Sequence, residues 1–396
     1  MLTGKEMLAE LPQQAPDALL ALIKMYAADD RAAKIDLGVG VYRTDKGATP
    51  VFSAIKHAER RLVEEQQSKA YLGPEGCMEF VESLKPIIFG ASLASSTNIA
   101  GMQTPGGTGG VRLAVALAKA AGVAKILMGV PSWPNHAQIM DDLGVPLVSF
   151  GHAREGRPDM DALRAAIAAA DAGDAVLLHG CCHNPTGIDY TQEQWQEIAG
   201  LIASKSLLPI LDLAYQGLGE GLEEDAQGVR TVMQAVPEAL LAYSCDKNFG
   251  LYRDRVGALY VQAADEAGLA RIMSNAASIA RATWSMPPDH GASAVREVLK
   301  DEQLRADWRD ELASMRKRMH EVRGVLAAAG IVGTIDMAPL AQQNGLFSML
   351  PLASEQIVAL RERHGVYMAG SGRINIAGLT LGNIDNFIGA VADVTG

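Results

Sequence analysis

Short apolar runs alternate with helical patterns through most of this chain, from about residue 50 to about residue 300. The helical patterns include residues 111–121 and 160–170, where apolar residues recur with helical spacing. Short apolar strands separated by helices predict a parallel sheet that helices cover on both faces. We expect its strands at residues 125–130, 175–179, 208–213, 240–244 and 256–261.

The segments on either side of this alternating region predict a second, smaller domain. An N-terminal helix is expected at residues 17–28, followed by an irregular strand and loop at residues 35–42. A long helical stretch at residues 305–329 leads to a strand, a helix, a strand and a final helix, the first three at 345–350, 354–364 and 373–377. The expected division is a large domain of residues 48–310 and a small domain formed by residues 1–47 and 311–396.

Composition excludes several classes of protein. The chain has 396 residues, enough for two domains and a large core, and 48% of them are hydrophobic. A net charge of −11 without a basic block argues against a nucleic-acid partner. No apolar run approaches the ~18 residues needed to span a membrane. Residues 1–10 lack the pattern of a signal peptide. The four cysteines form no disulfide framework, so we expect reduced thiols in a cytoplasmic protein.

Polar residues follow several of the expected strands, and ligands bind at the carboxyl ends of such strands. The most informative is Lys247, which stands where the strand at 240–244 runs out into a turn. Burial disfavours the charged form of a lysine and can lower its pKa. A neutral amine in that position is what an enzyme needs to hold an aldehyde cofactor as a Schiff base.

A glycine-rich segment, Thr-Pro-Gly-Gly-Thr-Gly-Gly at residues 104–110, precedes the helix expected at 111–121. Free backbone N–H groups and the positive end of a helix dipole suit such a segment to phosphate. A tight turn that requires positive φ explains the glycines equally well when they are considered alone. The spacing matches neither the dinucleotide nor the nucleoside-triphosphate fingerprint.

Two further motifs contribute polar groups. Asn184 precedes a proline, which favours an extended backbone that can aim the amide at a ligand. Asp212, at the end of an apolar strand, requires a cationic partner such as a pyridinium nitrogen, and Tyr215 lies three residues later. Each motif alone is also compatible with an ordinary strand-end turn. His179 and His183 are expected to be core histidines, and their spacing from the two adjacent cysteines does not suit zinc, so we expect no metal.

Together these motifs provide an anion cup, a ring-nitrogen partner, a phenolic-oxygen partner and an amine, in that order on one sheet. This combination is what pyridoxal 5′-phosphate requires.

At this point the chain resembles class I, fold-type I aminotransferases, in the branch of bacterial aspartate and aromatic-amino-acid aminotransferases. The resemblance runs from residue 34 to the C-terminus and is strongest at residues 35–43, 131–136, 179–187, 212–217, 219–225, 247–250 and 371–377. It implies an α/β fold with a mainly parallel seven-stranded sheet flanked by helices and a smaller α+β domain.

The resemblance also implies catalytic roles. Lys247 would bond the aldehyde of pyridoxal 5′-phosphate and then shuttle a proton. Asp212 would pair with the pyridine nitrogen, while Tyr215 and Asn184 would hydrogen-bond the phenolic oxygen.

The remaining cofactor contacts follow in the same way. Trp133 would stack on the ring, and His136 would support Asp212. The residues that would hold the phosphate are Gly107, Thr108, Ser244, Arg255 and, from the other subunit of a homodimer, Tyr71.

Substrate recognition is implied by two arginines. Arg373 would clamp the α-carboxylate through a bidentate fork. Arg281 would reach across the dimer to a distal carboxylate, although without the resemblance a solvated surface charge is the simpler interpretation. The residues that would line the substrate pocket are Val39, Gly40, Trp133 and Asn184, the first two on a small domain that closes over substrate.

The chain departs from the family pattern at two positions. Asp246 stands where the family usually has a serine that helps to bind phosphate. A carboxylate beside a phosphate is repulsive unless a cation neutralises it. We therefore expect Asp246 to pair with Arg255 or to turn out of the phosphate cup. Trp284 stands where a tyrosine is common, and it should affect the pocket wall rather than the chemistry.

These inferences predict ping-pong transamination of aromatic amino acids (tyrosine, phenylalanine), dicarboxylic amino acids (aspartate, glutamate) or both, with 2-oxoglutarate as acceptor. The segments 12–17 and 244–253 favour the aromatic branch. The alternatives are a strict aspartate aminotransferase, a pyridoxal-phosphate decarboxylase or lyase, and a non-catalytic regulator with the same fold.

Overall fold

The computed structural model describes residues 7–14 and 16–396. Residues 1–6 and residue 15 lie outside the described residues, so the expectations for residues 1–10, for residues 12–17 and for the start of the small domain fall partly outside them. Within the described part of the chain, no helix is both long and apolar enough to cross a membrane.

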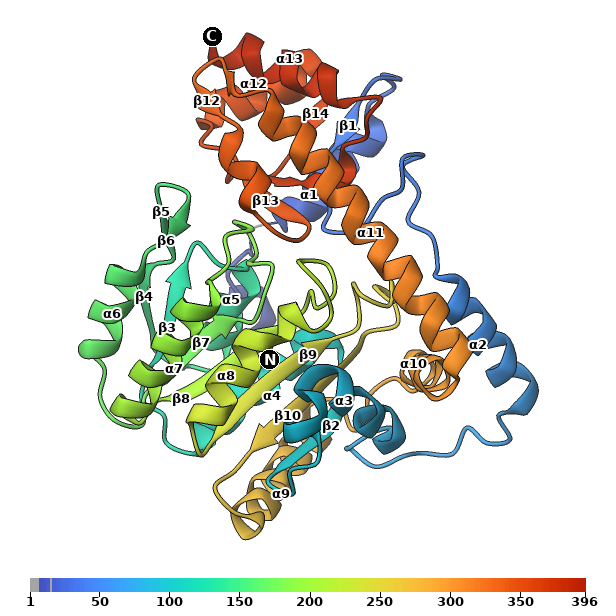
Figure 1. Cartoon of the computed structure of the whole chain (residues 1–396), viewed down its shortest axis with the longest axis vertical. Coiled ribbons are helices and arrows are strands. Elements are labelled where there is room, and N and C mark those ends of the chain that lie inside the picture. Colours follow the sequence, from blue (N-terminus) through green and yellow to red (C-terminus); the bar gives the residue numbers. More distant parts are fainter. Residues whose placement is uncertain (1–6, 15) are drawn as a thin grey trace, which may run out of the picture.

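A seven-stranded sheet with the strand order β2-β10-β9-β8-β7-β3-β4 lies in the lower half of the view in Figure 1, below the C-terminal elements. The α/β class and the five predicted strands are confirmed. The two edge strands were not predicted, because β2 contains glycine and polar residues and β4 is largely exposed. The strands are β2 (Ile99–Pro105), β3 (Ile126–Val130), β4 (Leu147–Gly151), β7 (Ala175–His179), β8 (Leu208–Leu213), β9 (Ala239–Ser244) and β10 (Val256–Gln262).

The sheet is mainly parallel, as the resemblance implied, and β10 is the exception. This strand pairs antiparallel with both β9 and β2, whereas β9, β8, β7, β3 and β4 pair in parallel. Residues 245–255 join β9 to β10 without a helix, and a parallel crossover needs about a dozen residues or more, usually including one. The chain therefore turns back beside β9, and Lys247 lies in this return.

Two apolar layers cover the faces of the sheet, because successive strand residues point to opposite sides. Leu240 and Ala242 of β9 belong to one layer, and Leu241 and Tyr243 belong to the other. The first layer packs on α4 (Gly106–Ala120), α5 (Pro134–Asp142) and α9 (Glu266–Thr283). The second packs on α3 (Met78–Ala94), α6 (Met160–Ala168), α7 (Gln192–Lys205), α8 (Gln227–Ala235) and α10 (His290–Lys300).

A long helix, α11 (Glu302–Ala328), runs from α10 and α2 (Ser53–Glu65) to the C-terminal elements (Figure 1). It begins three residues earlier than the predicted 305, because the Asp301 side chain accepts a hydrogen bond from Leu304 N at 3.0 Å and caps the helix. Its apolar stripe, including Trp308 and Leu312, is buried.

The C-terminal part of the chain pairs with the N-terminal segment. Strand β1 (Ile35–Asp36) runs parallel to β14 (Val366–Tyr367), and β13 (Phe347–Met349) runs antiparallel to β15 (Arg373–Asn375). Helices α12 (Ser354–His364) and α13 (Ile384–Thr395) confirm the predicted helices, and α1 (Ala18–Ala28) confirms the N-terminal one. The short elements are η1 (Met7–Glu10), β5 (Ala153–Arg154), β6 (Arg157–Pro158), η2 (Glu224–Ala226), β11 (Ile331–Val332), β12 (Ile335–Asp336), η3 (Ala338–Gln342) and η4 (Ile376–Gly378).

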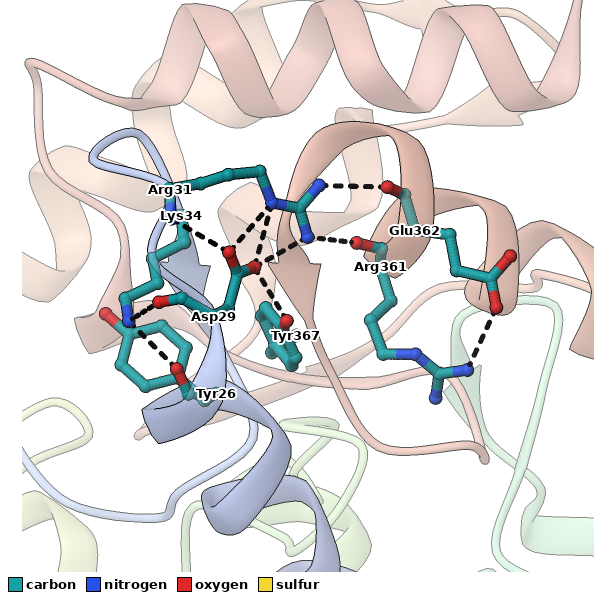
Figure 2. A network of polar contacts seen from close by, with 7 residues as sticks. All are labelled: Tyr26, Asp29, Arg31, Lys34, Arg361, Glu362 and Tyr367. Carbon is teal, nitrogen blue, oxygen red and sulfur yellow. Dashed lines mark hydrogen bonds and ion pairs between the residues drawn. The ribbon is translucent and has the colours of Figure 1, made fainter.

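A polar network fastens the N-terminal segment to the last turn of α12 (Figure 2). Arg31 donates to the backbone carbonyls of Arg361 and Glu362, both at 2.9 Å, and so satisfies carbonyls that a helix C-terminus leaves free. Asp29 accepts hydrogen bonds from Arg31 at 2.6 Å and from the Tyr367 hydroxyl at 2.7 Å. The hydrogen bonds from Arg31 hold the pKa of the Asp29 carboxyl well below its usual range. The N-terminal segment is therefore joined to the C-terminal elements by side chains as well as by β1.

Candidate active site

A cavity of about 190 Å³ lies at the carboxyl ends of β7, β8 and β9, beside the segment that follows β3. Polar residues were predicted at this edge of the sheet, because they follow the strands in the sequence. Most of the predicted site residues line it, namely Gly40, Gly107, Thr108, Trp133, Asn184, Asp212, Tyr215, Ser244, Lys247 and Arg255.

Lys247 is partly enclosed in the return between β9 and β10. Its Nζ atom lies 5.2 Å from the centroid of the Tyr215 ring. Burial lowers the pKa of the Lys247 ammonium, while the nearby carboxylates of Asp246 and Asp212 act in the opposite direction without reversing the shift. A lowered pKa increases the share of neutral amine, which is the form that attacks an aldehyde.

Asp212 is buried near the end of β8 and belongs to a chain of polar contacts. Its Oδ2 atom lies 2.9 Å from Nε2 of His136, whose Nδ1 atom lies 3.0 Å from Ser132 Oγ. Ser132 Oγ lies 2.9 Å from Nε2 of His179. Burial raises the pKa of Asp212, but the hydrogen bond with His136 and the electrostatic contributions of the neighbouring groups, Lys247 among them, together outweigh it, so the net shift is downward. The carboxylate therefore stays ionised and can hold a proton on a ring nitrogen.

Asn184 and Tyr215 meet at the wall of the cavity. The Asn184 amide donates to the Tyr215 hydroxyl at 3.3 Å. Burial, followed by the charge of Asp212, raises the pKa of the Tyr215 phenol above its usual range. The phenol therefore remains protonated and can donate a hydrogen bond to an oxygen in the cavity.

The glycine-rich segment forms the first turn of α4 and not a separate turn, so the helix predicted at 111–121 begins at Gly106. Gly106 has φ +70°, and a Cβ there would lie 2.5 Å from Nη2 of Arg255. A Cβ on Gly107 would lie 2.8 Å from the Cβ of Ser244. Glycine is thus required for the helix N-terminus to approach Ser244 and Arg255. The free N–H groups and the guanidinium together form an anion site suited to phosphate.

Asp246 pairs with Arg255, which confirms the expectation drawn from the sequence. Its other carboxylate oxygen accepts a hydrogen bond from Val256 N at 3.3 Å. The side chain is buried, yet it lines the same cavity as the glycine-rich segment. The charge of Asp246 is therefore balanced by Arg255, while its side chain still lines the cavity beside Gly107 and Thr108.

Arg373, the first residue of β15, approaches the cavity from the C-terminal part of the chain. Its guanidinium donates to the Gly38 carbonyl at 3.0 Å and to the Asn184 side-chain oxygen at 3.5 Å. The guanidinium carbon also lies 4.3 Å from the centroid of the Phe347 ring, and Phe347 was not predicted. A Cβ on Gly40 would lie 2.7 Å from the tip of Phe347, so glycine preserves this packing.

Val39 lies beside this group rather than on the cavity wall. Its carbonyl accepts a hydrogen bond from the Asn375 side chain at 2.6 Å, which fixes the loop that carries Gly40.

Tyr71 and Arg281 are the predicted residues that the structure does not bring to this cavity. The Tyr71 side chain is 93% exposed, and Arg281, near the end of α9, is exposed and donates to Ser285 Oγ at 2.6 Å. The backbone N–H of Leu72 lies 3.1 Å from the sulfur of Met286, so the two segments lie beside each other. Both residues are therefore exposed, on segments that lie beside each other.

Sequence reasoning missed Tyr252 and treated His179 as a core residue. The Tyr252 hydroxyl lines the cavity and accepts a hydrogen bond from Tyr42 N at 2.9 Å. Its position in the same return as Lys247 and Arg255 was the available signal. His179 is buried, and burial lowers its pKa to about 3, so it is neutral, as a core histidine is, although it also reaches the cavity.

The adjacent cysteines lie near a buried carboxylate. The sulfur atoms of Cys181 and Cys182 and a carboxylate oxygen of Asp225 lie within 4.8 Å of one another. Asp225 already accepts hydrogen bonds from the backbone N–H groups of Gly217 and Glu220, at 2.7 and 2.8 Å. Burial raises the pKa of the Cys181 thiol to about 12, which disfavours the thiolate that binds metals. The expectation of no metal stays a prediction.

Comparison with known proteins gives the family. Residues 32–391 match the family model described as aminotransferase class I and II. The chain is 48% identical to a tyrosine aminotransferase of Rhizobium meliloti (93% of this chain, 95% of that protein) and 42% identical to an aspartate aminotransferase of Salmonella typhi (96% and 97%). It also superposes with a TM-score of 0.95 on an aromatic-amino-acid aminotransferase from Burkholderia pseudomallei covalently bound to pyridoxal phosphate, at 33% identity over 99% of this chain and all of that chain. The protein is therefore a transferase that belongs to the class I and II aminotransferase family and has the fold-type I architecture.

Proposed function

We propose that this protein transfers amino groups from aromatic and dicarboxylic amino acids to 2-oxoglutarate, with pyridoxal 5′-phosphate bound through Lys247. The observation that carries the proposal is the convergence of an amine, a buried ionised carboxylate and an anion cup on one cavity. These groups come from β8, from the return after β9 and from the first turn of α4.

The residues present fit this cofactor. Gly106 and Gly107 leave a cradle that any Cβ would fill, and Thr108, Ser244 and Arg255 surround it with donors for a phosphate. Asp212 would hold the protonated ring nitrogen, and the residues that would contact the ring and its phenolic oxygen are Trp133, Tyr215 and Asn184. When bound, pyridoxal phosphate supplies an electron sink for the bond that breaks at the α-carbon.

The chain itself provides the proton transfers. The Lys247 amine would move the proton from the α-carbon of the amino acid to C4′ of the cofactor, and in the second half of the cycle from C4′ to the α-carbon of the newly formed amino acid. His136 would keep Asp212 ionised throughout, because their hydrogen bond favours the carboxylate. In this ping-pong scheme the amino acid leaves as an oxo acid before 2-oxoglutarate enters.

Substrate would be oriented by two arginines. Arg373 is placed to bind the α-carboxylate, with Phe347 and Asn184 holding its guanidinium. Arg281 and Tyr71 would act in the active site of a second copy, because both are exposed and neither lines the cavity of its own chain. The proposal therefore includes a homodimer with shared sites.

We also propose the division into a large domain of residues 48–310 and a small domain of residues 1–47 and 311–396. The pairing of β1 with β14 and the contacts of Arg31 support joining the two terminal segments. Gly40 and Arg373 would then reach the cavity from the small domain, which suits closure over substrate. We place the protein in the cytoplasm, in keeping with its four buried thiols.

The range of amino donors follows from the relatives and from the arginines. Relatives named for tyrosine, aromatic amino acids and aspartate include proteins that are 48%, 43% and 42% identical to this chain, in that order. A strict aspartate aminotransferase is the second candidate, and the exposed Arg281 favours it because a distal carboxylate needs a cation.

Half-reactions with single donors test the proposal. The cofactor-loaded protein is mixed separately with aspartate, tyrosine, phenylalanine and tryptophan in the absence of an oxo acid. We expect the visible absorbance of the bound cofactor to fall as the matching oxo acid is released. Unchanged spectra at saturating donor would contradict the proposal, and a response to aspartate alone would select the strict aspartate enzyme. Release of carbon dioxide or ammonia would instead indicate a decarboxylase or a lyase.

A further inference from the structure

The phosphate cup contains a fixed carboxylate. Asp246 is 3% exposed and lines the cavity together with Gly107, Thr108 and Ser244. One of its oxygens accepts from Arg255, and the other accepts from Val256 N at 3.3 Å. The carboxylate is thus held at both oxygens and cannot swing away without breaking these contacts.

Arg255 is occupied by this carboxylate. Its Nη1 atom donates to Asp246 and to the carbonyl of Tyr252, the latter at 3.0 Å. Among the described residues that line the cavity, the cationic ones are Lys247 and Arg255, and the anionic ones are Asp212 and Asp246. Arg255 is therefore already paired with an anionic neighbour before any phosphate enters.

The carboxylate lies where a phosphate would bind. A Cβ placed on Gly106 would lie 2.5 Å from Nη2 of Arg255 and 3.2 Å from the Asp246 oxygen that accepts from Arg255. The guanidinium and the carboxylate therefore face the same point at the N-terminus of α4. A phosphate held there by Arg255 would meet a like charge in a partly buried site, where screening by water is weak.

We propose that Asp246 is an internal competitor for Arg255, which weakens retention of the phosphate of the cofactor and makes the cofactor exchangeable. The inference rests on the proposed function, since it takes pyridoxal phosphate as the resident group. Binding of the phosphate separates the Asp246–Arg255 pair or shares the guanidinium with it. Removing the negative charge of Asp246 should therefore tighten the binding of phosphate-bearing ligands and leave ligands without phosphate unaffected.

The test uses the cofactor-free protein and three ligands. Pyridoxal phosphate and pyridoxal are titrated by absorbance, and inorganic phosphate is titrated by calorimetry. The variants are Asp246→Ser, which keeps a small hydroxyl, and Asp246→Asn, which keeps the size and the acceptor for Val256 N. Asp254→Ser is the matched control, because Asp254 lies in the same return and its neighbour is α10 rather than the cup. Circular dichroism verifies that each variant is folded.

We expect both Asp246 variants to bind pyridoxal phosphate at least about tenfold more tightly, because one like charge has been removed from a partly buried site. Inorganic phosphate should follow the same trend, while pyridoxal and the control should change little. Equal or weaker binding of pyridoxal phosphate would overturn the inference and show that Asp246 orients Arg255 for the phosphate. An equal gain for pyridoxal would also overturn it, since the effect would then act through Lys247.

The outcome for the proposed function is read separately. If neither aldehyde gives a visible band with the unsubstituted protein, the proposed function fails. The inorganic-phosphate titration still decides whether Asp246 competes for an anion, because it does not depend on Lys247.

Discussion

His136 and Asp212 share a buried contact of 2.9 Å that joins helix α5 to strand β8. Burial alone would raise the pKa of this carboxyl, and the hydrogen bond with His136 is the first of the contacts that together bring it below its usual value. The direction matters for the proposed chemistry, because only an ionised Asp212 can keep a ring nitrogen protonated.

Replacing His136 with asparagine should therefore raise the pKa of Asp212. A carboxyl with a lowered pKa loses its favourable interaction as the pH falls through that pKa, so raising the pKa moves the loss to higher pH. We expect the decline of kcat/KM on acidification to begin at a higher pH, and kcat to fall by about tenfold, as for a lost hydrogen bond to a charged group. The pH profile measures both, with His364→Asn at the surface as control. An unmoved acidic limb would contradict the role of His136.

Lys247 should destabilise the cofactor-free protein at neutral pH. Its pKa is lower in the folded protein than in the unfolded chain, so the protonated amine is less favourable in the folded state and opposes folding. Lys247→Met should thus raise the melting temperature of the cofactor-free protein at pH 7. The difference should shrink as the pH approaches about 10.4, the pKa of an unfolded lysine. Lys56→Met, at an exposed lysine, is the control. An equal or lower melting temperature for Lys247→Met would show that burial does not dominate at this site.

The two arginines should separate by substrate. Arg373→Gln removes the partner of a carboxylate common to all amino acids, so kcat/KM should fall for every donor. The fall should correspond to a loss of about 2 to 5 kcal/mol in binding free energy. Arg281→Gln should reduce kcat/KM for aspartate far more than for phenylalanine, because only aspartate has a distal carboxylate. Steady-state kinetics with both donors measures this split. Equal losses of kcat/KM for the two donors would show that Arg281 does not bind the distal carboxylate of the substrate.

The central part of the fold was predictable because strands such as β7 and β8 are buried on both faces and are apolar apart from His179 and Asp212 near their ends. The edge strand β4 escaped prediction, since Val148 and Ser149 are exposed and break the apolar pattern. The antiparallel direction of β10 follows from the short return at residues 245–255, because this return contains no helix that could carry the chain back for a parallel pairing. Apolar patterns fix which residues are buried more directly than they fix strand direction.

The candidate site was predictable to the extent that its residues follow strands. Asp212 and Lys247 stand out because polar groups at the ends of apolar strands need partners. Tyr252 escaped, because a tyrosine in a turn is equally compatible with ordinary packing. Tyr71 and Arg281 could be proposed only from the resemblance, since a contact with a second copy leaves no mark on the pattern of one chain.

Arg323 offers a test of how the substrate side of the cavity is held. This arginine of α11 is 1% exposed, and its guanidinium donates to the carbonyls of Gly345 and Phe347 at 2.9 and 2.8 Å and to Ser348 Oγ at 2.7 Å. Burial lowers its pKa to about 10, so it remains charged at neutral pH. These contacts fix strand β13, whose Phe347 ring packs against the guanidinium of Arg373.

Arg323→Met should leave buried carbonyls without donors and lower the free energy of unfolding by about 3 kcal/mol or more. Arg309→Met, at an exposed position of the same helix, should change it little. Because Phe347 supports Arg373, KM for every amino donor should rise in the Arg323 variant while the absorbance of bound cofactor is retained. Urea unfolding and steady-state kinetics measure the two effects. A loss of stability with an unchanged KM would separate the buried arginine from the substrate pocket.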